Sequence, residues 1–192
     1  MYHSCNLLTM KQLTLYKVSI KLGFQEYINL LTEQASMASD QLLTGQYVLL
    51  LLLPADEVLT IGKLGSFEFP AGWYAYVGSA FGAGGIVGRL KHHLKPVETP
   101  HWHIDYFRQA AEVKEIWISP DPEKHEQEWV ELILAVPGAA ILMDGFGASD
   151  SSQDSHLAYF DVKPSLEDFA IGVRARFPAI KVLRAFGEVD DD

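Results

Sequence analysis

The chain has 192 residues, of which 48% are hydrophobic and 21% are charged, a composition typical of a globular domain with its own core. Fifteen Lys and Arg against 25 Asp and Glu give a net charge of −10, which disfavours strong binding of a polyanion through the whole surface. The single cysteine, Cys5, excludes an internal disulfide and a cysteine-built zinc site, and suits a cytoplasmic protein. The longest apolar run, residues 48–53, is too short to span a bilayer, so no membrane association is expected.

Three segments are expected. Residues 1–40 have weak periodicity and are predicted to be an N-terminal extension, either poorly ordered or helical near residues 25–35, with Met37 as an alternative start. Residues 41–186 are predicted to form a single domain. The acidic tail, residues 187–192, is predicted to be disordered.

The first half of the domain is predicted to be rich in strands. Alternating or continuous apolar residues bounded by Pro and Gly predict strands at residues 45–53, 58–61, 66–69 and 73–77. In the last of these, Tyr74, Tyr76 and Gly78 share one face, while Ala75 and Val77 share the other. The short connecting turns predict an antiparallel meander.

A glycine-rich turn and a helix follow. The sequence GSAFGAGG, residues 78–85, lets the main chain turn tightly. A helix is predicted from about Gly85 to Lys95, with Arg89 and His93 together on its flank. Its buried stripe is expected to be Ile86, Leu90 and Leu94.

The second half alternates between helices and short strands. Helices are predicted at residues 102–109, from an Asp121 N-cap to about residue 135, and from a Ser165 N-cap to about residue 177. Strands are predicted at residues 113–119, 140–143, 156–160 and 181–186. The expected fold is therefore mixed α/β (α+β), a small central antiparallel sheet flanked by helices.

Several short motifs follow one another along the chain. Gly45-Gln46-Tyr47-Val48 opens the first strand, Tyr76-Val77-Gly78-Ser79-Ala80 ends the fourth, and Arg89 follows the glycines. Further motifs are HWHIDY at 101–106, GFGASD at 145–150 and SHL at 155–157. Over roughly residues 45–160 the chain resembles the GIY-YIG nuclease superfamily. It is most similar to a little-characterised branch, domain of unknown function 123, found alone or attached to endonuclease III-like repair glycosylases.

The resemblance implies a divalent-metal-dependent nuclease with a GIY-YIG-like fold, acting in DNA processing or repair. Its expected cofactor is loosely bound Mg²⁺ or Mn²⁺, and its expected partners are nucleic acid, DNA first, and a repair glycosylase. Phosphodiester hydrolysis needs an activated water, a Lewis acid and a cation for the developing charge. Tyr47 and Tyr76 would lie beside the scissile phosphate and Arg89 would bind it. Because a free tyrosine has a pKa of about 10, a tyrosine base needs Arg89 or a metal nearby.

The metal ligand implied by the resemblance is Glu128. Relatives carry a Glu-Cys pair where this chain has Glu128-Trp129, and Glu126 and Glu131 are neighbouring candidates. One carboxylate suits Mg²⁺ with several waters better than zinc. A glutamate on a helix is, however, more often simply solvated. The cysteines that relatives also carry after the GFGASD-like turn are replaced here by Ser151 and Gln153.

Further site residues are expected around these. His93 and His103 are candidate catalytic residues, and the candidate substrate-binding residues are Gly78, Ser79, Lys91, His101 and Asp105. If residues 101–105 were extended, His101, His103 and Asp105 would face one way, like a metallohydrolase site. On a helix, His101 and Asp105 would be neighbours instead.

Two other functions stay open. The net charge of −10 and the replaced cysteines favour a non-catalytic nucleic-acid-binding module, with salt-sensitive binding and no turnover. The other is a zinc- or manganese-dependent hydrolase of small phosphoesters built on His101, His103, Asp105 and His156. A tightly bound transition metal would favour this hydrolase, whereas loosely held Mg²⁺ would favour the nuclease.

Overall fold

A computed structural model describes residues 43–147 and 155–186 of the chain. The predictions for residues 1–40 and 187–192 lie outside these residues, as do those for Asp150, Ser151 and Gln153. No helix within the described ranges is both long enough and apolar enough to cross a membrane.

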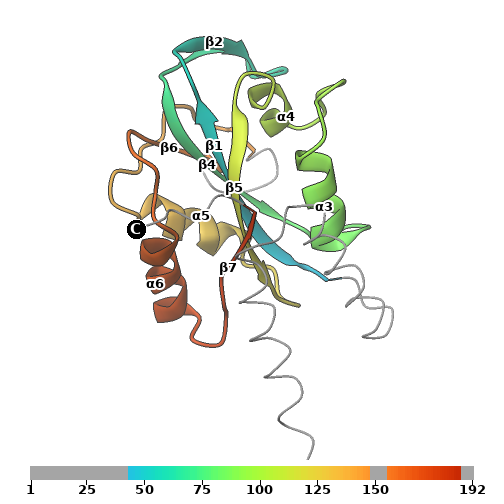
Figure 1. Ribbon diagram of the computed structural model, residues 1–192, viewed down its shortest axis with the longest axis vertical. Helices are drawn as coiled ribbons and strands as arrows, with labels where there is room; N and C mark the ends of the chain where they lie inside the picture. Colours follow the sequence, from blue (N-terminus) through green and yellow to red (C-terminus); the bar gives the residue numbers. More distant parts are fainter. Residues whose placement is uncertain (1–42, 148–154, 187–192) are drawn as a thin grey trace, which may run out of the picture.

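A five-stranded antiparallel sheet forms the centre of the fold, in the order β6-β4-β1-β5-β7 (Figure 1). Its strands are β1 (Gly45–Leu53), β4 (Gly72–Ser79), β5 (Glu112–Pro120), β6 (Leu157–Phe160) and β7 (Leu183–Phe186). The continuous apolar run of β1 is explained by its central position, because both of its faces are covered. The predicted mixed α/β fold with an antiparallel sheet is confirmed.

A separate hairpin replaces the predicted meander. Within the described residues, β2 (Glu57–Thr60) and β3 (Ser66–Phe69) pair with each other alone, as a two-stranded sheet between β1 and β4 in the chain. Most of their residues are exposed or half-buried, so they lack the two apolar faces that a strand inside the central sheet needs. β1 and β4 therefore pair directly with each other.

Helices cover both faces of the sheet (Figure 1). α3 (Gly85–His93) and α4 (His103–Phe107) pack on one face, and α5 (Glu126–Leu134) and α6 (Leu166–Arg176) on the other. The alternation predicted for β4 is confirmed, since Tyr74 and Tyr76 belong to the core beneath α3 and α4, whereas Ala75 and Val77 belong to the other core. Residues that share a strand thus serve two different layers.

Two predicted elements are wrong in detail. α5 begins at Glu126 and not at Asp121, because the Asp121 carboxylate accepts the Glu123 N–H in a turn, and the Asp121 N–H donates to the carbonyl of Thr44. The segment 121–125 is therefore held against the start of β1. Residues 140–143 form no strand, because only Ala140 bridges to Tyr159 at the edge of β6. The predicted Ser165 cap of α6 is confirmed, with its hydroxyl accepting two backbone N–H groups.

Candidate functional site

The two motif tyrosines lie on the face of the sheet covered by α3 and α4. Tyr47 on β1 is opposite Gly78 on β4, and Tyr76 is two residues away on the same face of β4. A Cβ atom at Gly78 would collide with the ring of Tyr47. Gly78 is therefore needed here to let this ring lie across β4.

His93 forms a buried pair with Tyr47. The Tyr47 hydroxyl lies 2.8 Å from Nε2 of His93, and the two residues are 3% and 1% exposed. The sequence predicted His93 on the flank of its helix, but its ring is inside, because residues 86, 90 and 93 make the buried stripe of α3. Leu94, predicted to be buried, is only half-buried.

Burial sets the protonation of this pair. It raises the pKa of Tyr47 well above the usual value, electrostatic coupling to Tyr76 and the Glu126 carboxylate adds to this, and the charge of Arg89 opposes it. Burial also lowers the pKa of His93 to about 3. At neutral pH the pair is therefore a phenol and a neutral imidazole.

Arg89 is held over an aromatic ring. Its guanidinium carbon lies 4.4 Å from the centre of the Trp102 indole, in the range of a cation–π contact. Both side chains are half-buried. The contact joins α3 to the start of α4 and fixes Arg89 beside Tyr47. This role of Trp102 was not predicted from the sequence.

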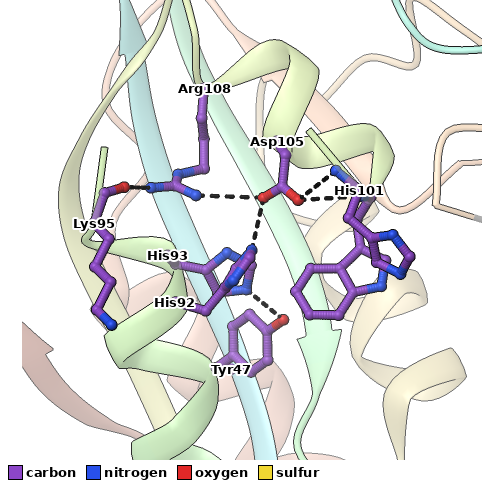
Figure 2. A network of polar contacts seen from close by, with 8 residues as sticks. Tyr47, His92, His93, Lys95, His101, Asp105 and Arg108 are labelled. Atoms are coloured by element: carbon purple, nitrogen blue, oxygen red, sulfur yellow. Dashed lines mark hydrogen bonds and ion pairs between the residues drawn. The ribbon is translucent and has the colours of Figure 1, made fainter. Parts of the chain in front are cut away.

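Asp105 is the centre of a polar network between α3 and α4 (Figure 2). One carboxylate oxygen accepts the backbone N–H groups of His101 and Trp102, at 3.1 and 3.0 Å. The other accepts from Nε2 of His92 at 2.9 Å and from Arg108 at 3.3 Å. Burial alone would raise the pKa of Asp105, but these hydrogen bonds outweigh burial and lower it. The carboxylate is therefore ionised at neutral pH.

His92 and Arg108 belong to the site but were not among the predicted site residues. Both border a cavity of about 500 Å³ next to Asp105. Its remaining lining residues are Lys95, Pro96, Val97, Glu98 and Thr99. The only sequence signal for His92 is its position beside His93, and helical periodicity alone would have placed it at the surface.

The side chains of the two histidines of the HWHIDY motif, His101 and His103, lie outside the network around Asp105. His101 is exposed, with its ring 5.5 Å from that of Trp102. Nδ1 of His103 accepts the N–H of Gly147 at 3.0 Å, and burial lowers the pKa of His103. Among the residues that the structure describes, the group able to hold a metal is His92, His93 and Asp105, so the imidazoles of His101 and His103 do not join Asp105 in this group.

His156 lies near the second motif tyrosine. It is 5% exposed, and its backbone N–H donates to the carbonyl of Phe146. A Cβ atom at Gly147 would touch both the ring of Tyr76 and the side chain of His156. His156 is therefore a neighbour of Tyr76. It does not belong to the candidate metal group that contains Asp105.

The three candidate glutamates of α5 have different surroundings. Glu128 lies 3.8 Å from Nδ1 of His125, and Glu131 forms an ion pair with Arg176 of α6. Only the charge of Glu126, among these three, acts on Tyr47. Glu126 also forms an ion pair with Lys124 at 2.9 Å, and α5 packs on the face of the sheet opposite Tyr47.

Two predicted substrate-binding residues lie apart from the buried network. Ser79 ends β4 and, by strand alternation, faces the α5 side of the sheet, whereas Tyr76 and Gly78 face α3. Lys91 is exposed on α3. Gly78, His101 and Asp105, by contrast, contact the network itself.

The fold and site define a mixed α/β domain with a buried tyrosine–histidine pair beside an arginine. A sequence profile of the family described as "Domain of unknown function DUF123" matches residues 46–177, and the chain belongs to this family. No curated protein matches the chain, and no solved structure does.

Proposed function

We propose that this protein is a divalent-metal-dependent nuclease of the GIY-YIG type, which hydrolyses phosphodiester bonds in nucleic acid. One observation carries the proposal: Tyr47, Tyr76, Arg89 and His93 come from β1, β4 and α3, yet their side chains gather on one face of the sheet. The ring centres of Tyr76 and His93 are 6.5 Å apart. The motifs showed only the order of these residues along the chain. Their grouping in the fold supports a common role.

In this proposal His93 positions the Tyr47 hydroxyl, and its imidazole stays neutral. With a pKa of about 3, only about one His93 ring in 10⁴ carries a second proton at pH 7. An imidazolium there would be costly, since burial and the nearby Arg108 charge both oppose it. The 2.8 Å contact therefore fixes the direction of the Tyr47 hydroxyl, which binds the substrate phosphate.

Tyr76 is the better candidate to act on water. It is half-buried, whereas Tyr47 is 3% exposed. In the proposed step the water oxygen forms a bond to phosphorus while its proton passes to the Tyr76 oxygen. The bond from phosphorus to the leaving oxygen breaks at the opposite side, and the leaving oxygen is then protonated by solvent. Tyr76 must first be ionised, and a cation near the two tyrosines favours this.

Arg89 supplies the fixed positive charge. Phosphate transfer spreads negative charge over the phosphate oxygens in the transition state, and a guanidinium can pair with two of them. The Trp102 ring, 4.4 Å from Arg89, reduces the side-chain entropy lost when phosphate binds. Arg89 is accordingly the residue expected to matter most for cleavage.

Glu126, with Glu128 as the alternative, would hold the Mg²⁺ ion. The donor set fits this ion, because a single half-buried carboxylate leaves room for the waters that Mg²⁺ retains. When bound, the ion would act as a Lewis acid on the phosphate. Each carboxylate already has a partner that the ion would displace, Lys124 at 2.9 Å for Glu126 and His125 at 3.8 Å for Glu128. Glu126 is named first because its charge contributes to the raised pKa of Tyr47.

The proposed substrate is DNA, bound through a locally basic surface. At the surface, residues 85–108 present Arg89, Lys91 and Lys95 against Glu98, because Arg108 and Asp105 are buried as a pair, although the whole chain carries −10. Binding is therefore expected to be modest and strongly weakened by salt. A role in DNA repair, beside a repair glycosylase, is part of this proposal and rests on the resemblance alone.

Cleavage of a labelled panel tests the proposal. The panel contains single-stranded, duplex and flapped DNA and RNA, incubated with Mg²⁺, Mn²⁺ or EDTA. We expect metal-dependent cutting that falls by about 100-fold or more in Arg89→Ala, the loss typical of removing one transition-state donor. Glu126→Gln and Glu128→Gln, compared side by side, identify the metal ligand by which of them loses cutting.

Arg174→Ala is the matched control, because Arg174 is an exposed helical arginine on α6, on the other side of the sheet. It should cut like the wild type. Equal cutting by Arg89→Ala, or cutting in EDTA, would contradict the proposal. Salt-sensitive binding without any cutting would instead establish the non-catalytic nucleic-acid-binding module.

A further inference from the structure

We propose that His92, His93 and Asp105 form a binding site for a divalent first-row transition ion, such as Zn²⁺. The three residues each offer one ligand atom, and these atoms lie within 4.8 Å of one another. They come from the last turn of α3 and the first turn of α4. Figure 2 shows both imidazoles between the Asp105 carboxylate and the ring of Tyr47. The site is distinct from the carboxylate proposed for Mg²⁺ and does not depend on nuclease activity.

The donor set selects the class of ion. Two imidazole nitrogens and one carboxylate suit zinc, iron, cobalt or manganese, whereas Mg²⁺ and Ca²⁺ prefer oxygen ligands throughout. Two ligand atoms bound to one such ion stand about 3.0–3.4 Å apart, given bonds of about 2.1 Å. Nε2 of His92 and the Asp105 oxygen are 2.9 Å apart, so this pair is already close to that spacing.

A second observation concerns the His93 ring. The Nδ1 atom of His93 is buried and has no hydrogen-bond partner, while Nε2 of the same ring contacts Tyr47. The residue is only 1% exposed, so water does not readily satisfy this nitrogen. A neutral imidazole nitrogen without a partner is the form that binds a metal ion. An ion at this position would remove the cost of the unsatisfied atom.

The surroundings already orient the carboxylate ligand. One oxygen of Asp105 is fixed by two backbone N–H groups, those of His101 and Trp102. Such outer contacts hold a ligand in place and raise metal affinity. The ion would replace the 3.3 Å contact of Arg108 to the other oxygen, and Arg108 would keep its 2.7 Å bond to the carbonyl of Lys95.

An entry path is also present. The cavity of about 500 Å³ is bordered by His92 and Asp105, and the His92 side chain is 40% exposed. His92 can therefore exchange its hydrogen bond to Asp105 for a metal bond without unfolding α3. This partial exposure also makes His92 the safest of the three ligands to mutate.

Titration of the full chain with Zn²⁺ alone and with Co²⁺ alone tests the site, in the absence of nucleic acid. Calorimetry gives affinity and stoichiometry, and the visible absorption of bound Co²⁺ reports nitrogen and oxygen coordination. We expect one ion per chain, with His92→Ala weakening binding by at least about tenfold. His125→Ala is the matched control, since His125 lies at the start of α5 on the other side of the sheet and its imidazole is not in the group, and it should bind like the wild type.

Equal affinity in wild type and His92→Ala, or no binding to wild type at 100-fold excess of the ion, would overturn the proposal. Thermal melting of both variants in EDTA shows whether either has lost its fold. Asp105→Asn, which keeps the size of the side chain, provides the second test and should also weaken binding. Because the readout is binding alone, a negative cleavage assay leaves this result unaffected.

Discussion

The two faces of the central sheet differ sharply in what they bury. Beneath α5 and α6 the packing is dominated by aromatic and aliphatic side chains, with Trp117 stacked on Phe169 at 5.4 Å and Trp129 edge-on to Phe169 at 5.1 Å. Beneath α3 and α4 the buried residues also include Tyr47 of β1, His93 of α3 and Asp105 of α4. β1 thus packs against an apolar core on each side, and the buried tyrosine, histidine and aspartate lie on the α3 side.

The α5 face also contains buried polar groups. Glu115, on β5, forms ion pairs with Lys163 at 3.0 Å and Arg184 at 2.7 Å and accepts the indole N–H of Trp117. Buried atoms without a hydrogen-bond partner occur on both faces among the described residues: Nδ1 of His93 on the α3 face, and atoms of Gln46, Ser119 and Trp129 on the α5 face. The α3 face differs because its buried histidine and aspartate lie close enough together, with His92, to hold an ion. We therefore assign the chemistry to the α3 face.

Truncating the aromatic core of the α5 face should have the largest effect on stability. Phe169→Ala removes a side chain that is 1% exposed and packs on two tryptophans, so we expect a loss of about 3–5 kcal/mol in the free energy of unfolding. Urea denaturation measures it. Zinc binding at low temperature should persist in the folded fraction; simultaneous loss of binding would show that the two faces are not separable.

The His93 ring should make stability depend on pH. Its folded pKa of about 3 lies below the unfolded value near 6.5, so the unfolded chain binds more protons between these values and stability falls as pH falls through this window. Between pH 6.5 and 5 this costs about 2 kcal/mol. Urea unfolding in EDTA, for wild type and His93→Gln, measures the two slopes. Parallel slopes would contradict the prediction.

A pair of glycine substitutions should have the smallest effects, of opposite sign. Gly78→Ala puts a methyl group against the Tyr47 ring and should cost about 1 kcal/mol while displacing the hydroxyl from His93. Gly88→Ala, in α3, meets only an ordinary contact with the carbonyl of Ala83 and should stabilise by about 0.5–1 kcal/mol. Thermal melting compares them. If Gly78→Ala stabilised the protein, the Tyr47 ring would have enough space for the added methyl group, contrary to this prediction.

Much of the fold was predictable because local patterns determined it. The nine-residue apolar run of β1 and the alternation in β4 indicated strands, and the Ser165 cap marked the start of α6. The start of α5 was missed because Asp121 has the chemistry of a helix cap and of a turn alike, and its contact with Thr44 is 77 residues away in sequence.

The site was predictable only in part. The motifs brought together Tyr47, Tyr76 and Arg89, but the burial of His93 depends on the packing of α3 against β1. The roles of His92, Trp102 and Arg108 depend on where α4 places Asp105, which no periodicity within α3 reveals. Long-range packing, rather than local propensity, decides which histidines meet.

The strand order also bears on how the domain folds. β1 lies at the centre of the sheet, but its partners β4 and β5 follow much later in the chain, at pairings such as Tyr47 with Gly78 and with Ile118. Loop closure over such separations precedes most of the contacts that stabilise the sheet, which places the domain among proteins that fold slowly for their size. The Tyr47–His93 contact spans 46 residues and forms only once α3 has docked on β1. Amide hydrogens of β1 should therefore exchange with solvent only through global unfolding, and their exchange rates would report the stability of the whole domain.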